Sequence, residues 1–178
     1  MSAGIRVFLL KNMTPKIIVL HHTASSKNTT LRDLENWHKQ RWPGFISSLG
    51  WHIGYHYVIL GSGEIVHTRQ DNEIGAHTIP NEGKLGICLM GNMEQEQPTL
   101  SQLNSLANLL TGLKSIHRLT NNDIQPHNRY SATLCPGKNL LIWLDNYRRK
   151  DLNYLQTMIY ELQKKIELLW QALKKITG

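Results

Sequence analysis

The stretch Lys-Ile-Ile-Val-Leu-His-His-Thr, residues 16–23, opens with an apolar run rich in β-branched residues and closes with two histidines. Such a run predicts a strand, because β-branched side chains suit a pleated, buried surface. The strand would place His21 and His22 at its carboxyl end. Successive strand residues point to opposite faces of a sheet, so we expect at most one of these histidines to join a given site.

The chain that follows alternates between patterns typical of helices and of strands. We expect a helix at 30–41 capped by Thr29 or Thr30, a hairpin of strands at 55–60 and 64–68, a buried strand at 85–90, a capped helix at 99–118 and a short helix around 139–147. The inward faces of the two longer helices should carry Leu31, Leu34, Trp37 and His38, and Leu103, Leu106, Leu110 and Leu113. Residues 120–138 are polar and predict a loop. This mixed order predicts one α/β domain over residues 1–147.

The C-terminal segment has a different periodicity. Its apolar residues are separated by alternating steps of three and four, the 3.5-residue repeat of a heptad stripe, and they are Leu152, Leu155, Ile159, Leu162, Ile166, Leu169, Leu173 and Ile176. We predict an amphipathic helix over 148–178. Its stripe would pack against a second copy or against the chain's own domain, or its basic charge would bring it to an anionic membrane. The regular stripe, which lacks a dense cationic face, favours packing.

Charge and composition narrow the classes of function. The 178 residues include 20 Lys and Arg against 13 Asp and Glu, a formal net charge of +7, which favours polyanions such as nucleic acid, anionic lipid or bacterial wall polymers. The sequence has no nucleic-acid-binding motif, so we expect no nucleic-acid partner. The length excludes a barrel enzyme of about 250 residues.

The N-terminal residues predict no secretory signal. Lys11 interrupts the short apolar run Ile5–Leu10, and no small-residue cleavage site follows it. Nowhere does the sequence approach the ~18 uninterrupted apolar residues of a membrane span. We therefore expect cytoplasmic synthesis without a signal peptide, with Cys88 and Cys135 as thiols or metal ligands rather than a disulfide.

Three segments carry residues suited to metal binding or catalysis. The polar stretch 125–137 holds His127 and Cys135, whose nitrogen and sulfur donors suit zinc. The two histidines that end the first strand form the second segment, and Tyr55 lies in the third. Each segment alone also fits a simpler interpretation, as a solvated loop, a structural histidine or a packed tyrosine. Cys88 lies in a predicted buried strand, so we do not expect a closed four-ligand structural site.

Taken together, the segments resemble a known family. The blocks Ile-Ile-Val-Leu-His-His-Thr-Ala at 17–24, Gly-Trp-His-Ile-Gly-Tyr-His-Tyr at 50–57, Lys-Leu-Gly-Ile-Cys-Leu-Met-Gly-Asn at 84–92 and the loop His127–Gly137 are similar, in order and spacing, to the type 2 N-acetylmuramoyl-L-alanine amidases. That family includes zinc-dependent phage endolysins and the animal peptidoglycan recognition proteins. The resemblance covers about residues 14–147 and implies a central mixed β-sheet flanked by helices, with the heptads outside it.

The resemblance also implies catalytic residues. By it, the zinc ligands fall on His21, His127 and Cys135, and the catalytic tyrosine falls on Tyr55. Thr133 stands where many phage members carry Lys and many recognition proteins carry Thr. We expect its hydroxyl, like that of Tyr55, to hydrogen-bond the oxyanion that develops during amide hydrolysis. Whether the tyrosine acts as base, acid or orienting group stays open.

Residues for substrate contact follow less directly. His77 resembles a histidine at the same place in the family and is expected to line the cleft. Trp37, Trp42 and Trp51 are candidates for contacts with sugars or stem peptides, with packing an equally good interpretation for each.

The implied activity is zinc-dependent hydrolysis of the amide between N-acetylmuramic acid and L-alanine in peptidoglycan, as in a phage or prophage endolysin that acts on the cell wall after release. The alternative is a recognition module that binds peptidoglycan without cutting it. Such modules typically lack the cysteine ligand, so the presence of Cys135 favours catalysis.

Overall fold

The computed structural model describes residues 12–26 and 28–177, without the side chains of residues 150–158, 161, 172 and 175–177. The apolar run Ile5–Leu10 and the heptad side chains at 152, 155 and 176 therefore lie outside the described residues. The chain divides into two compact units, Met1–Leu141 and Ile142–Gly178. The domain boundary that we predicted after residue 147 falls later, inside the second unit.

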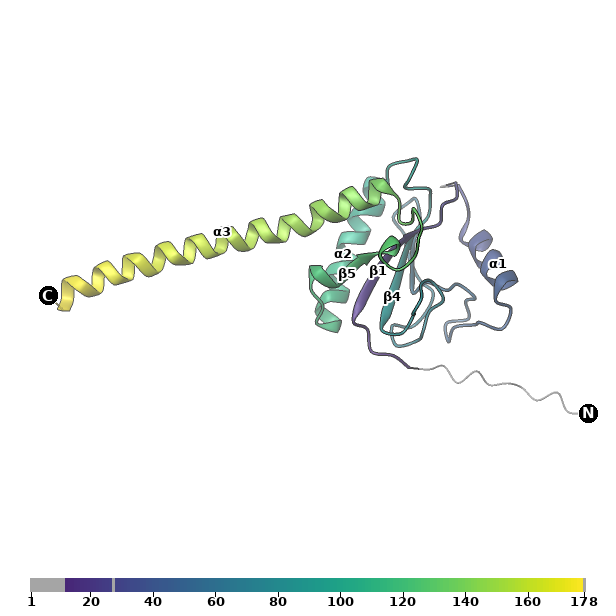
Figure 1. Cartoon of the computed structure of the whole chain (residues 1–178), viewed down its shortest axis with the longest axis horizontal. Coiled ribbons are helices and arrows are strands. Elements are labelled where there is room, and N and C mark those ends of the chain that lie inside the picture. The colour runs from purple at the N-terminus through teal and green to yellow at the C-terminus, as the bar shows by residue number, and fades with distance from the viewer. Residues whose placement is uncertain (1–11, 27, 178) are drawn as a thin grey trace, which may run out of the picture. The chain divides into compact units, whose positions relative to one another are not determined.

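The first unit is built on a five-stranded mixed sheet with the order β3-β2-β4-β1-β5 (Figure 1). Its strands are β1 (Ile17–His22), β2 (Tyr57–Ile59), β3 (Ile65–His67), β4 (Lys84–Leu89) and β5 (Ile124–Pro126). β1 runs parallel to β4 and β5, and β4 runs parallel to β2, whereas β2 and β3 form an antiparallel hairpin. The predicted α/β class with a central mixed sheet is confirmed.

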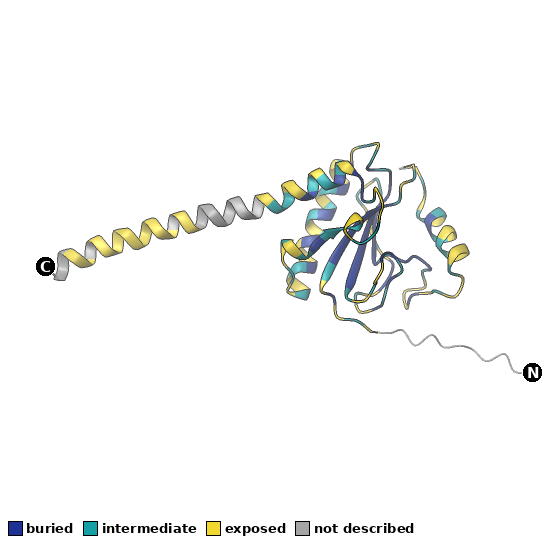
Figure 2. Cartoon of the chain, viewed as in Figure 1, coloured by how far each residue is buried: buried dark blue, intermediate teal, exposed yellow. Residues whose placement is uncertain are grey.

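The core centres on β1 and β4, two of the three strands that have neighbours on both edges. Every residue of β4 is buried, and so are Ile18–His22 of β1 (Figure 2). Such near-continuous apolar runs are expected where a parallel strand is covered on both faces. His21 pairs in register with Cys88, so the first histidine of the motif is held at the middle of the sheet.

Helix α1 (Leu31–Arg41) is capped by Thr30, one of the two predicted caps, which forms a capping box with Asp33. Only Leu34 of this helix is fully buried, whereas Trp37 is 46% exposed, so the prediction that Trp37 faces inward is wrong. Polar contacts of two neighbouring residues hold the helix in this orientation. The Glu35 carboxylate accepts from the backbone N–H of His52, and His38 accepts from that of Gly54, which leaves Trp37 at the margin.

Helix α2 (Leu100–His117) lies on the opposite side of the sheet from α1 (Figure 1). Its capping box pairs Thr99 with Gln102, again as predicted. The buried Gln102 amide also donates to the carbonyl of Met90, at 2.9 Å, and so ties the start of α2 to the residue after β4. The predicted inward leucines are buried, except that Leu103 is half-buried.

Two predictions for the chain after α2 are wrong. The segment 120–138, predicted as a loop, contains β5, which pairs in parallel with β1. Three residues with one apolar side chain, Ile124, are too few to show a period. The predicted short helix around 139–147 is the start of one continuous helix, α3 (Lys138–Thr177). The charged residues at 148–151 do not end it, because Arg and Lys are good helix formers.

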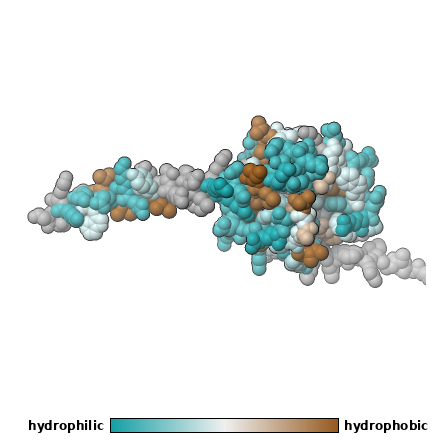
Figure 3. Space-filling view, turned by 45° about the horizontal axis from the view of Figure 1, so that its top comes forward, coloured by the Kyte–Doolittle hydropathy of each residue, from teal (hydrophilic) through white to brown (hydrophobic). Residues whose placement is uncertain are grey.

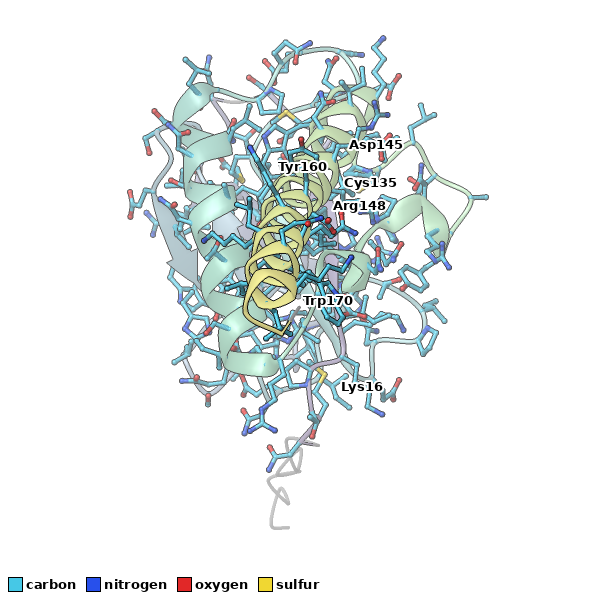
Figure 4. The ribbon with its side chains drawn as sticks, turned by 90° about the vertical axis from the view of Figure 1, so that its left-hand side faces the viewer. Lys16, Cys135, Asp145, Arg148, Tyr160 and Trp170 are labelled. Carbon is cyan, nitrogen blue, oxygen red and sulfur yellow. The ribbon has the colours of Figure 1, made fainter. Side chains whose placement is uncertain are left out.

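The second unit is helical, and large apolar side chains of its described part are exposed. They are Ile142, Ile159, Tyr160, Leu162, Ile166, Leu168, Leu169, Trp170 and Leu173. Figure 3 shows brown, hydrophobic atoms along this part of α3, and Figure 4 labels Tyr160 and Trp170 among its side chains. Within the described residues, no helix combines the length and the apolar character that crossing a membrane requires.

Candidate metal centre and active-site cavity

Three side chains that are far apart in the sequence meet at the end of β1. His21, His127 and Cys135 each offer one ligand atom, and these atoms lie within 4.8 Å of one another. His21 comes from the buried strand β1, His127 opens the short helical turn after β5, and Cys135, labelled in Figure 4, lies in the loop before α3. Because β5 pairs with β1, the sheet itself brings His127 next to His21.

The donor set and its surroundings fit a zinc ion. Nδ1 of His127 is a buried polar atom with no hydrogen-bond partner among the described residues, which a bound cation would satisfy. Cys135 Sγ lies 3.7 Å from His21 Nδ1, and it also accepts from the backbone N–H of His22 at 3.4 Å. Two imidazoles and one thiolate are ligands that zinc prefers, and three protein ligands leave a fourth position for water or substrate.

The adjacent histidines of β1 have separate surroundings, as strand alternation predicts. His21 packs edge-on against His77 and lies 4.4 Å, ring to ring, from His127. His22 instead accepts from the backbone N–H of Met93 through its Nδ1, at 3.0 Å. Only the His21 side chain therefore reaches the donor cluster, while the His22 side chain hydrogen-bonds the segment that follows β4.

Burial sets the protonation of the cluster. It lowers the pKa of His21 well below its ordinary value and also lowers the pKa of His127, so both imidazoles are neutral near pH 7 and have a lone pair for a metal. Burial raises the pKa of the Cys135 thiol to about 11, against the hydrogen bond from His22, which lowers it. A thiolate at this position therefore needs a nearby cation to form.

An open cavity of about 520 Å³ lies against the donor cluster. It is lined by His38, Arg41, Trp42, Tyr55, Ala76, His77, Thr78, Ile79, Asn81, His127 and Ser131. One wall thus carries a candidate ligand, and the others mix aromatic, cationic and amide groups. A cavity of this kind suits an extended polar substrate with some apolar surface.

Tyr55 stands between the donor cluster and the cavity. Its ring centroid lies 5.1 Å from that of His21 and 5.4 Å from that of His38. Burial raises the pKa of its hydroxyl well above the ordinary value, so the group keeps its proton at neutral pH. A protonated phenol at this place is a hydrogen-bond donor.

Of the other predicted site residues, one lines the cavity and three do not. His77 lines the cavity, but it is buried and its ring contacts His21. Thr133 is exposed, does not line the cavity, and accepts from the backbone N–H of Cys135 at 3.2 Å. Trp37 and Trp51 also lie outside the cavity lining, and Trp51 packs against the core cluster around Ile53.

Sequence reasoning missed several cavity residues. His38, Arg41, Asn81 and Ser131 line the cavity, and of the three tryptophans considered only Trp42 does so. His38 and Arg41 lie on the last turn of α1, where the helical pattern alone predicts packing or solvent. Asn81 accepts from the backbone N–H groups of His77 and Thr78 at 2.9 Å, a local turn that no periodicity predicts.

Comparison with known proteins agrees with this geometry. The model of the N-acetylmuramoyl-L-alanine amidase family matches residues 11–138. The chain is 36% identical over 90 residues to peptidoglycan-recognition protein SD of Drosophila simulans, covering 49% of this chain and 48% of that protein. It is 27% identical over 139 residues to the endolysin of Enterobacteria phage T3, covering 73% of this chain and 85% of the endolysin.

A solved structure shares the fold. The N-acetylmuramoyl-L-alanine amidase LysC from Clostridium intestinale URNW is 35% identical, with a TM-score of 0.63, over 72% of this chain and 80% of LysC. Because the family model spans most of the first unit, this chain belongs to the N-acetylmuramoyl-L-alanine amidase family. The matched residues contain all three candidate metal ligands and all residues that line the cavity.

Proposed function

We propose that this chain is a zinc-dependent N-acetylmuramoyl-L-alanine amidase that cleaves the bond between N-acetylmuramic acid and the L-alanine of the stem peptide. The observation that carries the proposal is the cluster of His21, His127 and Cys135 at the wall of an open cavity. When bound there, zinc supplies a Lewis acid and lowers the pKa of a coordinated water. The unpartnered, buried Nδ1 of His127 supports a metal at this place.

The protein's own groups have distinct roles in this proposal. Tyr55, protonated at neutral pH, donates a hydrogen bond to the oxyanion as the carbonyl becomes tetrahedral, rather than removing a proton. Arg41 and Trp42 at the cavity give a cation and an aromatic face, which suit the carboxylates and sugar rings of peptidoglycan. The Thr133 hydroxyl accepts a hydrogen bond from the backbone N–H of Cys135, so we assign Thr133 a structural role in the loop that carries Cys135.

A peptidoglycan-binding module without activity is the second candidate. Such a protein needs the cavity but not the metal. Cys135 separates the two candidates, since its sulfur completes the donor set of a metal that a binding module does not need. We therefore favour the enzyme, in the manner of an endolysin that reaches the cell wall after release from the cytoplasm.

The decisive experiment combines metal analysis of the purified chain with mass spectrometry of digested murein. We expect about one zinc per chain and free stem peptides that begin with L-alanine. New glycan reducing ends without free stem peptides would contradict the amidase assignment. Binding of murein without any cleavage, by zinc-loaded protein, would favour the recognition module instead. Cys88→Ser is the control for zinc content, because Cys88 is a buried thiol outside the donor cluster. Its thiol interacts with the Tyr55 side chain, so zinc content rather than turnover is the measurement for this variant.

We further propose that α3 pairs with α3 of a second copy as a parallel coiled coil. Ile159 and Ile166 occupy the first core position of the heptad, and Leu162 and Leu169 occupy the second, a distribution that favours two strands. All four side chains are exposed in the single chain. Lys165 occupies the last position of its heptad and Trp170 the fifth position of the next one. In a parallel pair these two positions face each other across the two chains, so Lys165 of one copy can form a cation–π contact with Trp170 of the other.

Light scattering at micromolar concentration tests this pairing. The intact chain should have the mass of a dimer, and Leu169→Glu should give a monomer. Leu168→Glu is the matched control, since Leu168 is also exposed but lies outside the heptad core. A monomeric intact chain would contradict the pairing. If that monomer sediments with vesicles of anionic lipid, the membrane alternative replaces it.

A further inference from the structure

The ring of His77 lies directly behind His21 and contacts a different partner through each nitrogen. Its Nδ1 lies 3.1 Å from His21 Nε2, and its Nε2 lies 3.2 Å from the carbonyl oxygen of Lys84. Both imidazoles are buried, and the two rings meet nearly at right angles. Although His77 borders the cavity, neither ring nitrogen is left to bind a substrate.

These two contacts fix the position of every ring proton. A backbone carbonyl can only accept, so Nε2 of His77 carries the proton that it donates to Lys84. A neutral imidazole has one N–H, so Nδ1 of His77 is an acceptor, and the hydrogen bond with His21 must come from His21 Nε2. His21 then has its lone pair on Nδ1, the nitrogen that lies 3.7 Å from Cys135 Sγ.

The backbone leaves space for the His77 ring at two glycines. A Cβ on Gly86 of β4 would lie 2.6 Å from Cδ2 and 2.9 Å from Nδ1 of His77. A Cβ on Gly75 would also lie 2.6 Å from Cδ2. Distances this short are excluded for real side chains, so both positions require glycine for the ring to stay where it is. The ring thus fits closely against the backbone at both glycines, as a group that positions another residue must be.

We propose that His77 is a positioning residue, which holds His21 in the tautomer whose Nδ1 can bind the metal. We call the hydrogen-bonded series from the Lys84 carbonyl through His77 to His21 the relay. This inference rests on the proposed metal site. The hydrogen-bonded partner of a ligand histidine is usually a carboxylate, a carbonyl or a water, and its loss typically weakens metal binding by about 10- to 100-fold. In this chain the partner of His21 is a second imidazole, that of His77, whose own tautomer is fixed by the carbonyl of Lys84.

Zinc affinity, measured by competition with a chelator, tests the relay. His77→Leu leaves His21 Nε2 without an acceptor and should weaken zinc binding by about 10- to 100-fold. His77→Asn keeps an acceptor oxygen near the place of Nδ1 and should recover most of that loss. His67→Leu is the matched control, because His67 is exposed on β3 and lies outside the donor cluster. The zinc affinity of this variant should equal that of the unchanged chain. Equal affinity in His77→Leu would overturn the proposal.

Nitrogen-15 NMR of the metal-free, unchanged protein tests the same relay without any variant. We expect His21 and His77 both to be protonated at Nε2 and unprotonated at Nδ1. A proton on Nδ1 of His21 would overturn the relay, even if His77→Leu failed to fold. Failure of the metal site itself has a different signature, because the unchanged protein would then bind no zinc while the two imidazoles kept their tautomers.

Discussion

The sheet core and the described outer part of α3 carry similar apolar side chains in opposite environments. Every residue of β4 is buried, whereas Ile166 and Leu169 of α3 are 58% and 70% exposed. Both segments are predicted from the sequence by their apolar side chains, β4 by a continuous run and α3 by a heptad stripe. The comparison teaches that periodicity indicates which side chains share a face, while burial depends on whether something covers that face. The family match also ends at residue 138, where α3 begins, so the proposed chemistry and the proposed pairing belong to different parts of the chain.

The largest effect should come from the proposed metal ligands of the first unit. We expect His127→Ala and Cys135→Ser to lose zinc and to reduce amidase turnover by at least about 1,000-fold, because a metal contributes several kcal/mol to amide hydrolysis. Zinc content and release of stem peptides are the measurements. Leu169→Ala, in the exposed stripe, should change neither. A Cys135→Ser protein with full zinc content and turnover would contradict the division between the two regions.

Truncating one leucine in each region compares their packing directly. Leu110→Ala should lower the free energy of unfolding by about 2–5 kcal/mol, because Leu110 is fully buried. Leu169→Ala should change it by less than about 0.5 kcal/mol when the chain is dilute enough to be monomeric. Urea unfolding measures both. Similar losses from the two substitutions would mean that α3 is covered within a single chain.

Acid should act on the first unit, because residues 142–178 contain no histidine. Burial lowers the pKa of His56 to about 4, so the unfolded chain takes up a proton near pH 6.5 that the folded chain refuses until about pH 4. This contribution to stability is present above pH 6.5 and is lost as the pH falls, by about 1.4 kcal/mol per pH unit.

Urea unfolding of the metal-free protein at several pH values between 4 and 7 measures the acid response. His56→Gln should flatten the dependence by about one proton. Ile116→Gln, at an exposed position that carries no titratable group, is the control and should leave the slope unchanged. An unchanged slope in His56→Gln would show that other buried groups dominate.

The smallest effect should follow removal of residues 148–178. If the chemistry belongs to the first unit alone, turnover of a soluble muropeptide should stay within about twofold. Dimer mass should be lost at the same time. A large fall in turnover on the soluble substrate, with the shortened chain still folded and loaded with zinc, would place part of the active site in α3.

The sequence predicted the elements that have strong local signals. A run of β-branched residues predicted β1, a continuous apolar run predicted β4, and threonine caps predicted the starts of α1 and α2 within a residue. β5 was missed because its three residues show no period, although its pairing with β1 is what brings His127 toward His21. The continuity of α3 was missed because a change of periodicity does not require a break in the backbone.

The candidate site shows the same limit. The His–His motif and the His127–Cys135 loop became a cluster only through the family resemblance, since a sequence separation of more than a hundred residues has no local signature. His77 was predicted as a cleft residue, whereas both its ring nitrogens bond to protein atoms. The sequence could not indicate this, because the contact depends on empty space at Gly75 and Gly86.

The three donors should differ in how long their backbone stays closed to solvent. β1 hydrogen-bonds to strands on both edges, so the amides around His21 should exchange with deuterium only when the whole unit opens. His127 and Cys135 lie in a half-exposed segment outside the main strands, which can open by itself. A chelator should therefore remove the ion from the folded protein, at a rate governed by motion of that segment, while the strand beneath keeps its protection.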